Sequence, residues 1–198
     1  MAAAPARAAP QDVEILEFLT AGALERAFAL LLDRYEGKVY RLCCAMLGDR
    51  VLAQDVAQES LVRIWRALGT YDGRASLSTW IYTIARNRCR TALDRRRAQG
   101  PLEDLDAQNE DALPPATSPA GGERFELLRE LVDALPEHYR VPITLYYYEE
   151  RSVSEVAALL ALPEGTVKTK LHRGRAELLA QLRRRGLETL DVWLESSS

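Results

Sequence analysis

The chain has 198 residues, of which 47% are hydrophobic and 28% are charged, and its formal net charge is −3. This composition is typical of one or two small globular domains. Because the net charge is negative, the electric field of the whole molecule does not attract nucleic acid. Cys43, Cys44 and Cys89 have neither the number of a disulfide framework nor the spacing of a zinc site. We therefore expect reduced thiols and no metal.

The charged residues are sorted into blocks along the chain. Residues 86–97 contain six Arg and one Asp, and residues 168–185 contain seven Lys or Arg and one Glu. Between these basic blocks, residues 103–111 contain five acids and no base. Such segregation indicates segments with different partners, so the basic blocks are candidates for local contacts with nucleic acid.

Residues 1–11 are rich in Ala and Pro and contain no long apolar run. We expect a disordered tail there, with no secretion signal. An apolar stretch of about 18 residues, the length that spans a membrane, is absent from the sequence. These features predict a soluble, cytoplasmic protein that is not inserted in a membrane.

Apolar residues recur at helical spacing over residues 12–98, which we predict to form one helical domain. Gly22 is expected to interrupt the first pattern, and Gly48 ends the pattern that follows. A further helix is predicted over residues 51–68, and a loop containing two Gly follows it. The apolar side predicted for that helix consists of Val51, Leu52, Val56, Leu61, Ile64, Trp65 and Leu68.

Residues 99–122 are rich in Pro, Gly, Ala and acids and lack periodicity, so we predict a flexible linker. Helical spacing returns over residues 123–185. Pro136 is the expected start of one helix, and Pro142 either bends it or sets its first turn. Strand alternation is absent, so the predicted fold is all-α, with two small helical domains. Residues 186–198 form an extension without an assigned role.

Residues 152–175 predict a helix-turn-helix. Ser152 and Glu155 have the spacing of a capping box, and after a short turn a second helix begins near Glu164. This helix has an apolar side and a basic side, as a reader of the DNA major groove requires. A solvated basic face on an ordinary helix has the same charge pattern, so the preceding short helix and turn favour DNA binding.

Four stretches resemble one protein family. "SEVAALLALPE" followed by "GTVKTKLHRGRAEL" resembles domain 4 of bacterial RNA polymerase sigma factors of the extracytoplasmic-function (ECF) group, in the sigma-70 family. "DVAQESLVRIWRAL" and "ASLSTWIYTIARNRCRTALDRRR" resemble parts of sigma domain 2 in the same group. One helix-turn-helix is a weak signal, but both halves in the right order are a strong one.

The resemblance implies a transcription initiation factor with no catalysis, cofactor or small-molecule substrate of its own. Its implied partners are core RNA polymerase, promoter DNA and an anti-sigma factor, and its implied domains are residues 12–98 and 123–185. The alternative is a free-standing helix-turn-helix regulator, which requires only the second domain and leaves residues 50–97 unexplained. An enzyme has least support, because no phosphate loop or catalytic triad is recognisable.

For core polymerase, the resemblance implies a binding surface in residues 50–68. Asp55, Gln58 and Glu59 are spaced i, i+3 and i+4, so they share one helix face, and Arg63 extends it. In the family the matching region binds the clamp helices of the largest polymerase subunit.

For the promoter −10 element, the resemblance implies a loop over residues 71–78 that captures flipped bases. Tyr71 is the best stacking candidate, whereas Trp80 is as compatible with a core position. Arg88 and Arg95–Arg97 are expected to hold the DNA backbone. The residues implied for the −10 site are Tyr71, Arg74, Ser76, Leu77, Trp80, Arg86, Asn87 and Arg90.

For the −35 element, the implied residues are Gly165, Thr166, Lys168, Thr169, His172 and Arg173. The first two begin a helix, where free N–H groups can hold a phosphate. Two residues depart from the family pattern. Ala161 stands where Gly is common in the turn, at a cost of up to about 1 kcal/mol if the site needs positive φ. Gly174 is expected to weaken or bend the helix.

Overall fold

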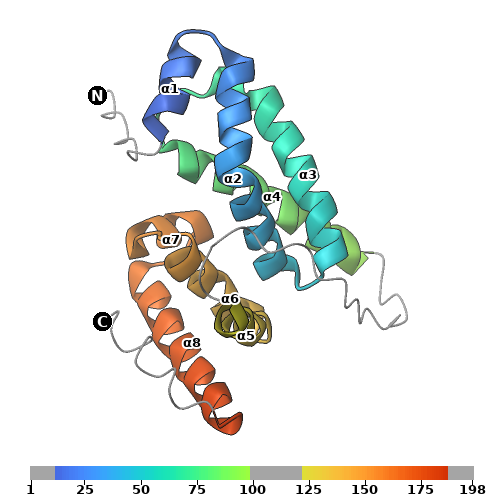
Figure 1. Cartoon of the computed structure of the whole chain (residues 1–198), viewed down its shortest axis with the longest axis vertical. Helices are drawn as coiled ribbons and strands as arrows, with labels where there is room; N and C mark the ends of the chain where they lie inside the picture. The colour runs from blue at the N-terminus through green and yellow to red at the C-terminus, as the bar shows by residue number, and fades with distance from the viewer. Residues whose placement is uncertain (1–11, 99–121, 187–198) are drawn as a thin grey trace. The chain divides into compact units, whose positions relative to one another are not determined.

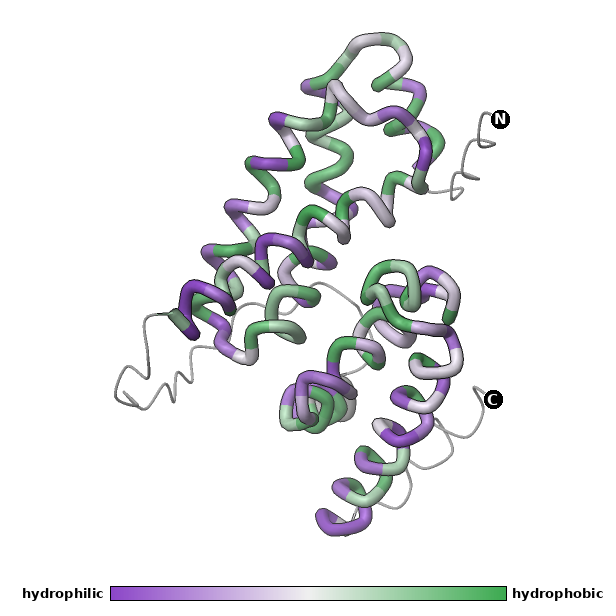
Figure 2. The backbone as a smooth tube through the Cα atoms, turned by 180° about the vertical axis from the view of Figure 1, so that it is seen from behind, coloured by the Kyte–Doolittle hydropathy of each residue, from purple (hydrophilic) through white to green (hydrophobic). Residues whose placement is uncertain are grey.

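A computed structural model describes residues 12–98 and 122–186. In these ranges every regular element is a helix, and the chain divides into two compact units, Met1–Asn109 and Glu110–Ser198. Figure 1 shows α1 to α4 in the first unit and α5 to α8 in the second. The prediction of an all-α fold with two small domains is confirmed. Figure 2 shows apolar and polar residues interspersed along these helices, as expected of amphipathic helices that bury one side.

The first unit contains four α-helices among the described residues. They are α1 (Val13–Thr20), α2 (Leu24–Leu47), α3 (Arg50–Ala67) and α4 (Leu77–Ala98), with a short 3-10 helix, η2 (Leu68–Thr70), after α3. Gly22 separates α1 from α2 with φ of +73°, and Gly48 ends α2 with φ of +68°. Both breaks lie where the sequence predicted them, because a glycine takes the left-handed conformation without steric cost.

The core of the first unit is built around α2, which packs against α1, α3 and α4. Tyr35 and Tyr82 are fully buried and meet edge to face, with ring centroids 6.4 Å apart. The Tyr35 hydroxyl donates to Oδ1 of Asp12 at 2.7 Å, which satisfies the buried phenol. The buried side of α3 includes Val56, Ile64 and the following Leu68, as the sequence predicted.

The second unit consists of α5 (Gly122–Asp133), α6 (Glu137–Ile143), the π-helical segment η3 (Thr144–Tyr148), α7 (Val153–Leu160) and α8 (Glu164–Arg184). Pro136 is the N-cap of α6, as expected, while Pro142 lies inside the helix and does not set its first turn. Proline has no N–H to donate, and the regular α-helix ends one residue later in the π-helical segment.

Gly174 lies in the contact between α6 and α8. A Cβ atom at this position would lie 2.6 Å from Cδ1 of Ile143 and 3.3 Å from Cβ of Tyr139. The expectation that Gly174 weakens the helix missed this role, because the missing side chain is what lets α6 pack directly on α8. Ile143 and Leu178 are among the buried residues of this contact region.

Candidate polymerase and nucleic-acid interfaces

The helix-turn-helix of α7 and α8 is built as the sequence predicted. The Ser152 hydroxyl accepts from the Glu155 N–H at 3.2 Å, and the Glu155 carboxylate accepts from the Ser152 N–H at 2.9 Å. Burial opposes ionisation of Glu155, but hydrogen bonds from Ser152 and the charge of Arg151 outweigh it and lower the pKa of this carboxyl. Ala161 ends α7 with φ of +54°, so the turn has the backbone that favours glycine.

Along α8, Val167, Leu171 and Leu178 face the core. The residues implied for the −35 element gather on the opposite side, where Gly165, Lys168, Thr169, His172 and Arg173 are exposed and Thr166 is half-buried. Within the described residues, none of these cations takes part in an ion pair. The face is therefore an unneutralised cationic surface, suited to a polyanion.

One detail of the helix start differs from expectation. The Thr166 N–H donates to the Pro163 carbonyl oxygen at 2.9 Å, so it is not free to hold a phosphate. Beside this first turn lies an open hollow of about 350 Å³, to which α6 contributes His138 and Tyr139. Sequence reasoning missed these two residues, because nothing in their local pattern places α6 beside the recognition helix.

The four residues implied for polymerase contact, Asp55, Gln58, Glu59 and Arg63, are all exposed on α3. Two large apolar side chains share this exposed side: Val62 is 48% exposed and Trp65 is 39% exposed. The sequence listed Val51 and Trp65 on one apolar side together with the buried Val56 and Ile64, but both are exposed, Val51 by 58%. Trp65 nevertheless contacts Phe28 of α2, with ring centroids 4.9 Å apart.

Arg88 does not take the place expected for a DNA backbone contact. It is only 8% exposed, and its guanidinium donates to Oε2 of Glu59 on α3. Arg88 and Glu59 are 29 residues apart in the chain and lie on different helices, so spacing within one helix does not reveal the pair. Arg88 is thus a structural partner of the α3 face.

Tyr71 in the loop before α4 contacts both the loop backbone and Trp80 of the helix. The Tyr71 hydroxyl donates to the Ala75 carbonyl oxygen at 2.7 Å, and its ring meets Trp80 with centroids 5.5 Å apart. Burial, followed by the charges of Asp12 and Asp72, raises the pKa of Tyr71. The two half-buried rings form an edge-to-face pair between the loop and the start of α4, so they are not separate stacking sites.

The remaining residues implied for the −10 site differ in their exposure. Arg74 is exposed and pairs with Asp72 at 3.0 Å, while the Ser76 hydroxyl accepts from the Thr79 N–H at 3.2 Å and caps α4. Leu77 is 1% exposed, so its side chain belongs to the core and is not available to DNA. The structure therefore contradicts a direct side-chain contact from Leu77.

Further along α4, Asn87 and Arg90 are exposed and Arg86 is half-buried, with all three on one side of the helix. Burial, and then the neighbouring charge of Arg90, lower the pKa of Arg86. At the helix end Arg95–Arg97 are exposed, although Arg96 lies 3.6 Å from a carboxylate oxygen of Asp49. This side of α4 is the basic surface of the first unit.

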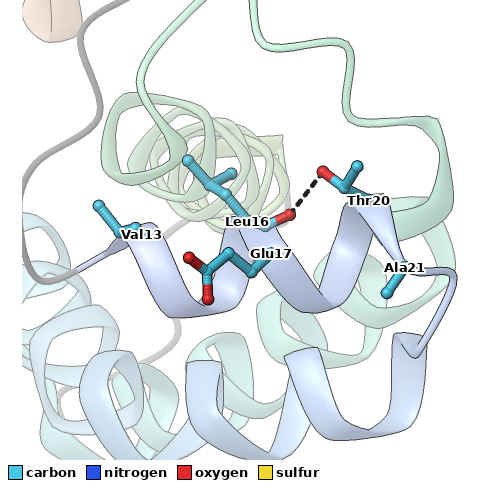
Figure 3. A pocket seen from close by; sticks show the side chains of 5 residues that line it. All are labelled: Val13, Leu16, Glu17, Thr20 and Ala21. Atoms are coloured by element: carbon cyan, nitrogen blue, oxygen red, sulfur yellow. Dashed lines mark hydrogen bonds between the residues drawn. The ribbon is translucent and has the colours of Figure 1, made fainter.

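A second hollow lies on the outer side of α1 and has a volume of about 460 Å³. Figure 3 shows its lining residues, Val13, Leu16, Glu17, Thr20 and Ala21, with the Thr20 hydroxyl bonded to the Leu16 carbonyl oxygen. It coincides with none of the sites implied by the sequence. In the described parts of the chain, no cluster of His, Cys, Asp and Glu can hold a metal ion, and no helix is long and apolar enough to cross a membrane.

A helix-turn-helix in one unit and a basic helix in the other define a DNA-binding protein. The family models for sigma-70 region 2 and sigma-70 region 4 match residues 31–99 and 125–178. The ECF RNA polymerase sigma factor SigW of Bacillus subtilis is 36% identical over 170 residues, covering 79% of this chain and 89% of SigW. The chain belongs to the ECF sigma factors of the sigma-70 family, which are transcription initiation factors.

Other relatives and solved structures agree with this assignment. RNA polymerase sigma-H factor of Pseudomonas aeruginosa is 34% identical, over 83% of this chain and 90% of its own length. The structure of CnrH in complex with the cytosolic domain of CnrY is similar with a TM-score of 0.57 and 26% identity, covering 84% of this chain and 96% of CnrH. The sigma factor RpoE of Bartonella quintana, solved with the anti-sigma factor NepR, has the same fold, with a TM-score of 0.63 and 19% identity over 79% of this chain and 96% of RpoE.

Proposed function

We propose that this sigma factor binds its partners through three separate surfaces. The exposed side of α3, with Asp55, Gln58, Glu59 and Arg63, binds core RNA polymerase. The Tyr71–Trp80 pair and the basic side of α4 bind the −10 element, and the exposed side of α8 reads the −35 element. The proposed domains are residues 12–98 and 123–185. The proposed sigma factor catalyses no reaction itself, and it acts with the polymerase in the cytoplasm.

The observation that carries the proposal is that one chain presents the exposed carboxylates Asp55 and Glu59 on α3 and two separate cationic faces, on α4 and α8. The acids of α3 are unsuited to DNA but suited to basic side chains of a protein partner, where charge sets register and specificity. The cations of α4 and α8 are suited to phosphate. A free-standing regulator needs only the face on α8 and gives no role to the acids of α3.

We further propose that an anti-sigma factor covers these surfaces in the resting state. The side of α3 exposes Val62 and Trp65 beside its charged residues, a mixture typical of protein interfaces. The similar CnrH was solved in complex with the cytosolic domain of another protein. A partner that occupies the α3 face prevents polymerase binding without any change in the DNA-binding faces.

The test is copurification of the chain with core polymerase, followed by run-off transcription on genomic fragments. The proposal predicts that core enzyme and chain together initiate at defined promoters, and that the chain alone shifts the same fragments weakly. Tight, sequence-specific binding of duplex DNA by the chain alone, with no retention of core polymerase, contradicts the proposal and supports the free-standing regulator.

A further inference from the structure

Cys43 on α2 and Cys89 on α4 lie side by side in the core of the first unit. The Cys89 thiol donates a hydrogen bond to Sγ of Cys43, with a sulfur–sulfur distance of 3.5 Å. Both side chains are fully buried, and neither belongs to a surface proposed above. Although the sequence has no disulfide framework, the fold brings together two thiols that are 46 residues apart in the chain.

The packing of α2 on α4 fixes this pair in place. The two helices also meet at Tyr35 and Tyr82, and the thiol pair lies about two turns farther along each helix. The helices therefore run parallel through both contacts, which hold the two sulfur atoms opposite each other. A disulfide bond is about 2.05 Å long, so each sulfur atom has to move by roughly 0.7 Å to form one.

Cys44 is not placed to take part in this pair. It follows Cys43 directly on α2, and consecutive residues of a helix do not face the same way. Its side chain is half-buried, whereas Cys43 and Cys89 are closed off from solvent. The third cysteine is therefore a built-in comparison for the reactivity of the other two.

The reduced pair is unreactive in the closed fold. The hydrogen bond with Cys89, and then burial, raise the pKa of Cys43. Because the thiolate is the nucleophilic form of cysteine, a protonated and buried thiol reacts slowly. We therefore expect both thiols to persist until the unit opens locally in the presence of an oxidant.

We propose that Cys43 and Cys89 are a site of reversible disulfide formation, with hydrogen peroxide as the oxidant. One sulfur, as its thiolate, attacks a peroxide oxygen and breaks the O–O bond, which gives a sulfenic acid and, with the thiol proton, one water molecule. The second sulfur then attacks the sulfenic sulfur. The S–S bond forms, the S–O bond breaks, and a second water molecule leaves with the proton of the second thiol. The two electrons lost by the thiols reduce one molecule of peroxide.

The disulfide closes a loop of the chain that contains α3, η2 and the loop before α4. A cross-link across so long a loop lowers the conformational entropy of the unfolded chain, and the native positions of the sulfur atoms need little adjustment. The oxidised first unit is therefore more stable than the reduced one. Its disulfide is a brace between α2 and α4, and it does not depend on the proposed DNA or polymerase surfaces.

The first measurement counts thiols in the folded, full-length chain before and after treatment with hydrogen peroxide. Alkylation under denaturing conditions, followed by mass spectrometry, should find all three cysteines alkylated before treatment and one after it. Cys44→Ser keeps the proposed pair and should lose both of its thiols to an intramolecular disulfide. Cys43→Ala is the matched control, because it also keeps two thiols but should form no intramolecular disulfide.

Two results would overturn the proposal at this stage. One is a wild-type chain in which peroxide leaves Cys43 and Cys89 as thiols and oxidises only Cys44. The other is a Cys43→Ala chain that forms a disulfide through Cys44 as rapidly as the Cys44→Ser chain does through Cys43.

The second measurement is thermal unfolding of the Cys44→Ser chain, oxidised and then reduced again by dithiothreitol. Trp193→Phe is added, so that the fluorescence comes from Trp65 and Trp80 of the first unit. Oxidation should raise the midpoint by roughly 5–15 °C, and reduction should reverse the rise. Peroxide should cause no rise in the same chain carrying Cys89→Ala.

The oxidised and reduced samples have the same sequence, so any stability lost through the substitutions does not enter the comparison. An unchanged or lower midpoint in a chain whose disulfide is confirmed by mass spectrometry would overturn the brace.

Discussion

Arg88 on α4 donates a hydrogen bond to the carboxylate of Glu59 on α3 and is itself buried, with 8% of its surface exposed. The pair joins the helix proposed for −10 DNA to the helix proposed for the polymerase. Within the described residues, the Nε atom of Arg88 has no hydrogen-bond partner. Glu59 is therefore the main neutralising contact of a buried cation, in addition to belonging to the exposed face.

Glu59→Lys is expected to destabilise the first unit by about 1–3 kcal/mol, because it leaves a buried guanidinium unpaired and places a like charge beside it. Urea unfolding of the full chain measures this loss. Arg88→Leu provides the comparison: once the buried cation is gone, Glu59→Lys should cost much less. Equal losses in both backgrounds would show that the pair does not stabilise the fold.

Asp55→Lys tests the polymerase face without this complication, because Asp55 is exposed and forms no ion pair among the described residues. The free energy of unfolding should change by less than about 0.5 kcal/mol, while affinity for core polymerase falls. Fluorescence anisotropy of the labelled chain with core enzyme measures the affinity. Normal affinity in the folded variant would remove Asp55 from the interface.

Gly174→Ala is expected to destabilise the second unit, even though alanine has the higher helix propensity. The added methyl group would meet Cδ1 of Ile143 at 2.6 Å, and overpacking of this kind costs about 1–3 kcal/mol. Ile143→Val removes that atom, so Gly174→Ala should cost less in the valine background. Thermal unfolding of the four chains of this cycle gives the coupling, and its absence would contradict the packing argument.

Glu155→Gln is expected to lower stability at neutral pH by removing the charge that Arg151 and Ser152 stabilise. The folded-state pKa of Glu155 lies below its unfolded value. Its contribution is therefore present above the ordinary pKa of about 4.3 and lost as the pH falls through the folded-state value. Urea unfolding should show the difference between wild type and variant shrinking from pH 7 toward pH 3. A constant difference would indicate that charge is not involved.

Arg173→Ala is expected to weaken −35-dependent initiation. Loss of a base contact costs about 1–3 kcal/mol of DNA-binding free energy and relaxes the base preference at one promoter position. Run-off transcription on single-base promoter variants measures both effects. Arg184→Ala, which removes an exposed cation from the last turn of the same helix, serves as the control. Initiation that is unchanged on every variant would remove Arg173 from the site.

The sequence by itself determined the local structure of this protein. Gly22 and Gly48 end helices because of backbone sterics, Ser152 and Glu155 begin one through local hydrogen bonds, and apolar spacing places Val56 and Val167 in the core. Each of these signals acts within a few residues, so each can be read along the chain. The resemblance that identified the family depended on the same local stretches.

Only the tertiary structure decided which side chains meet across helices. It paired Arg88 with Glu59, buried Leu77, left Trp65 partly exposed beside Phe28, and placed His138 next to the recognition helix. Helical periodicity specifies which side of a helix a residue occupies, but not which helix covers that side or how closely. Those outcomes depend on packing between segments distant in the chain, such as the contact at Gly174 where a missing Cβ lets α6 approach α8.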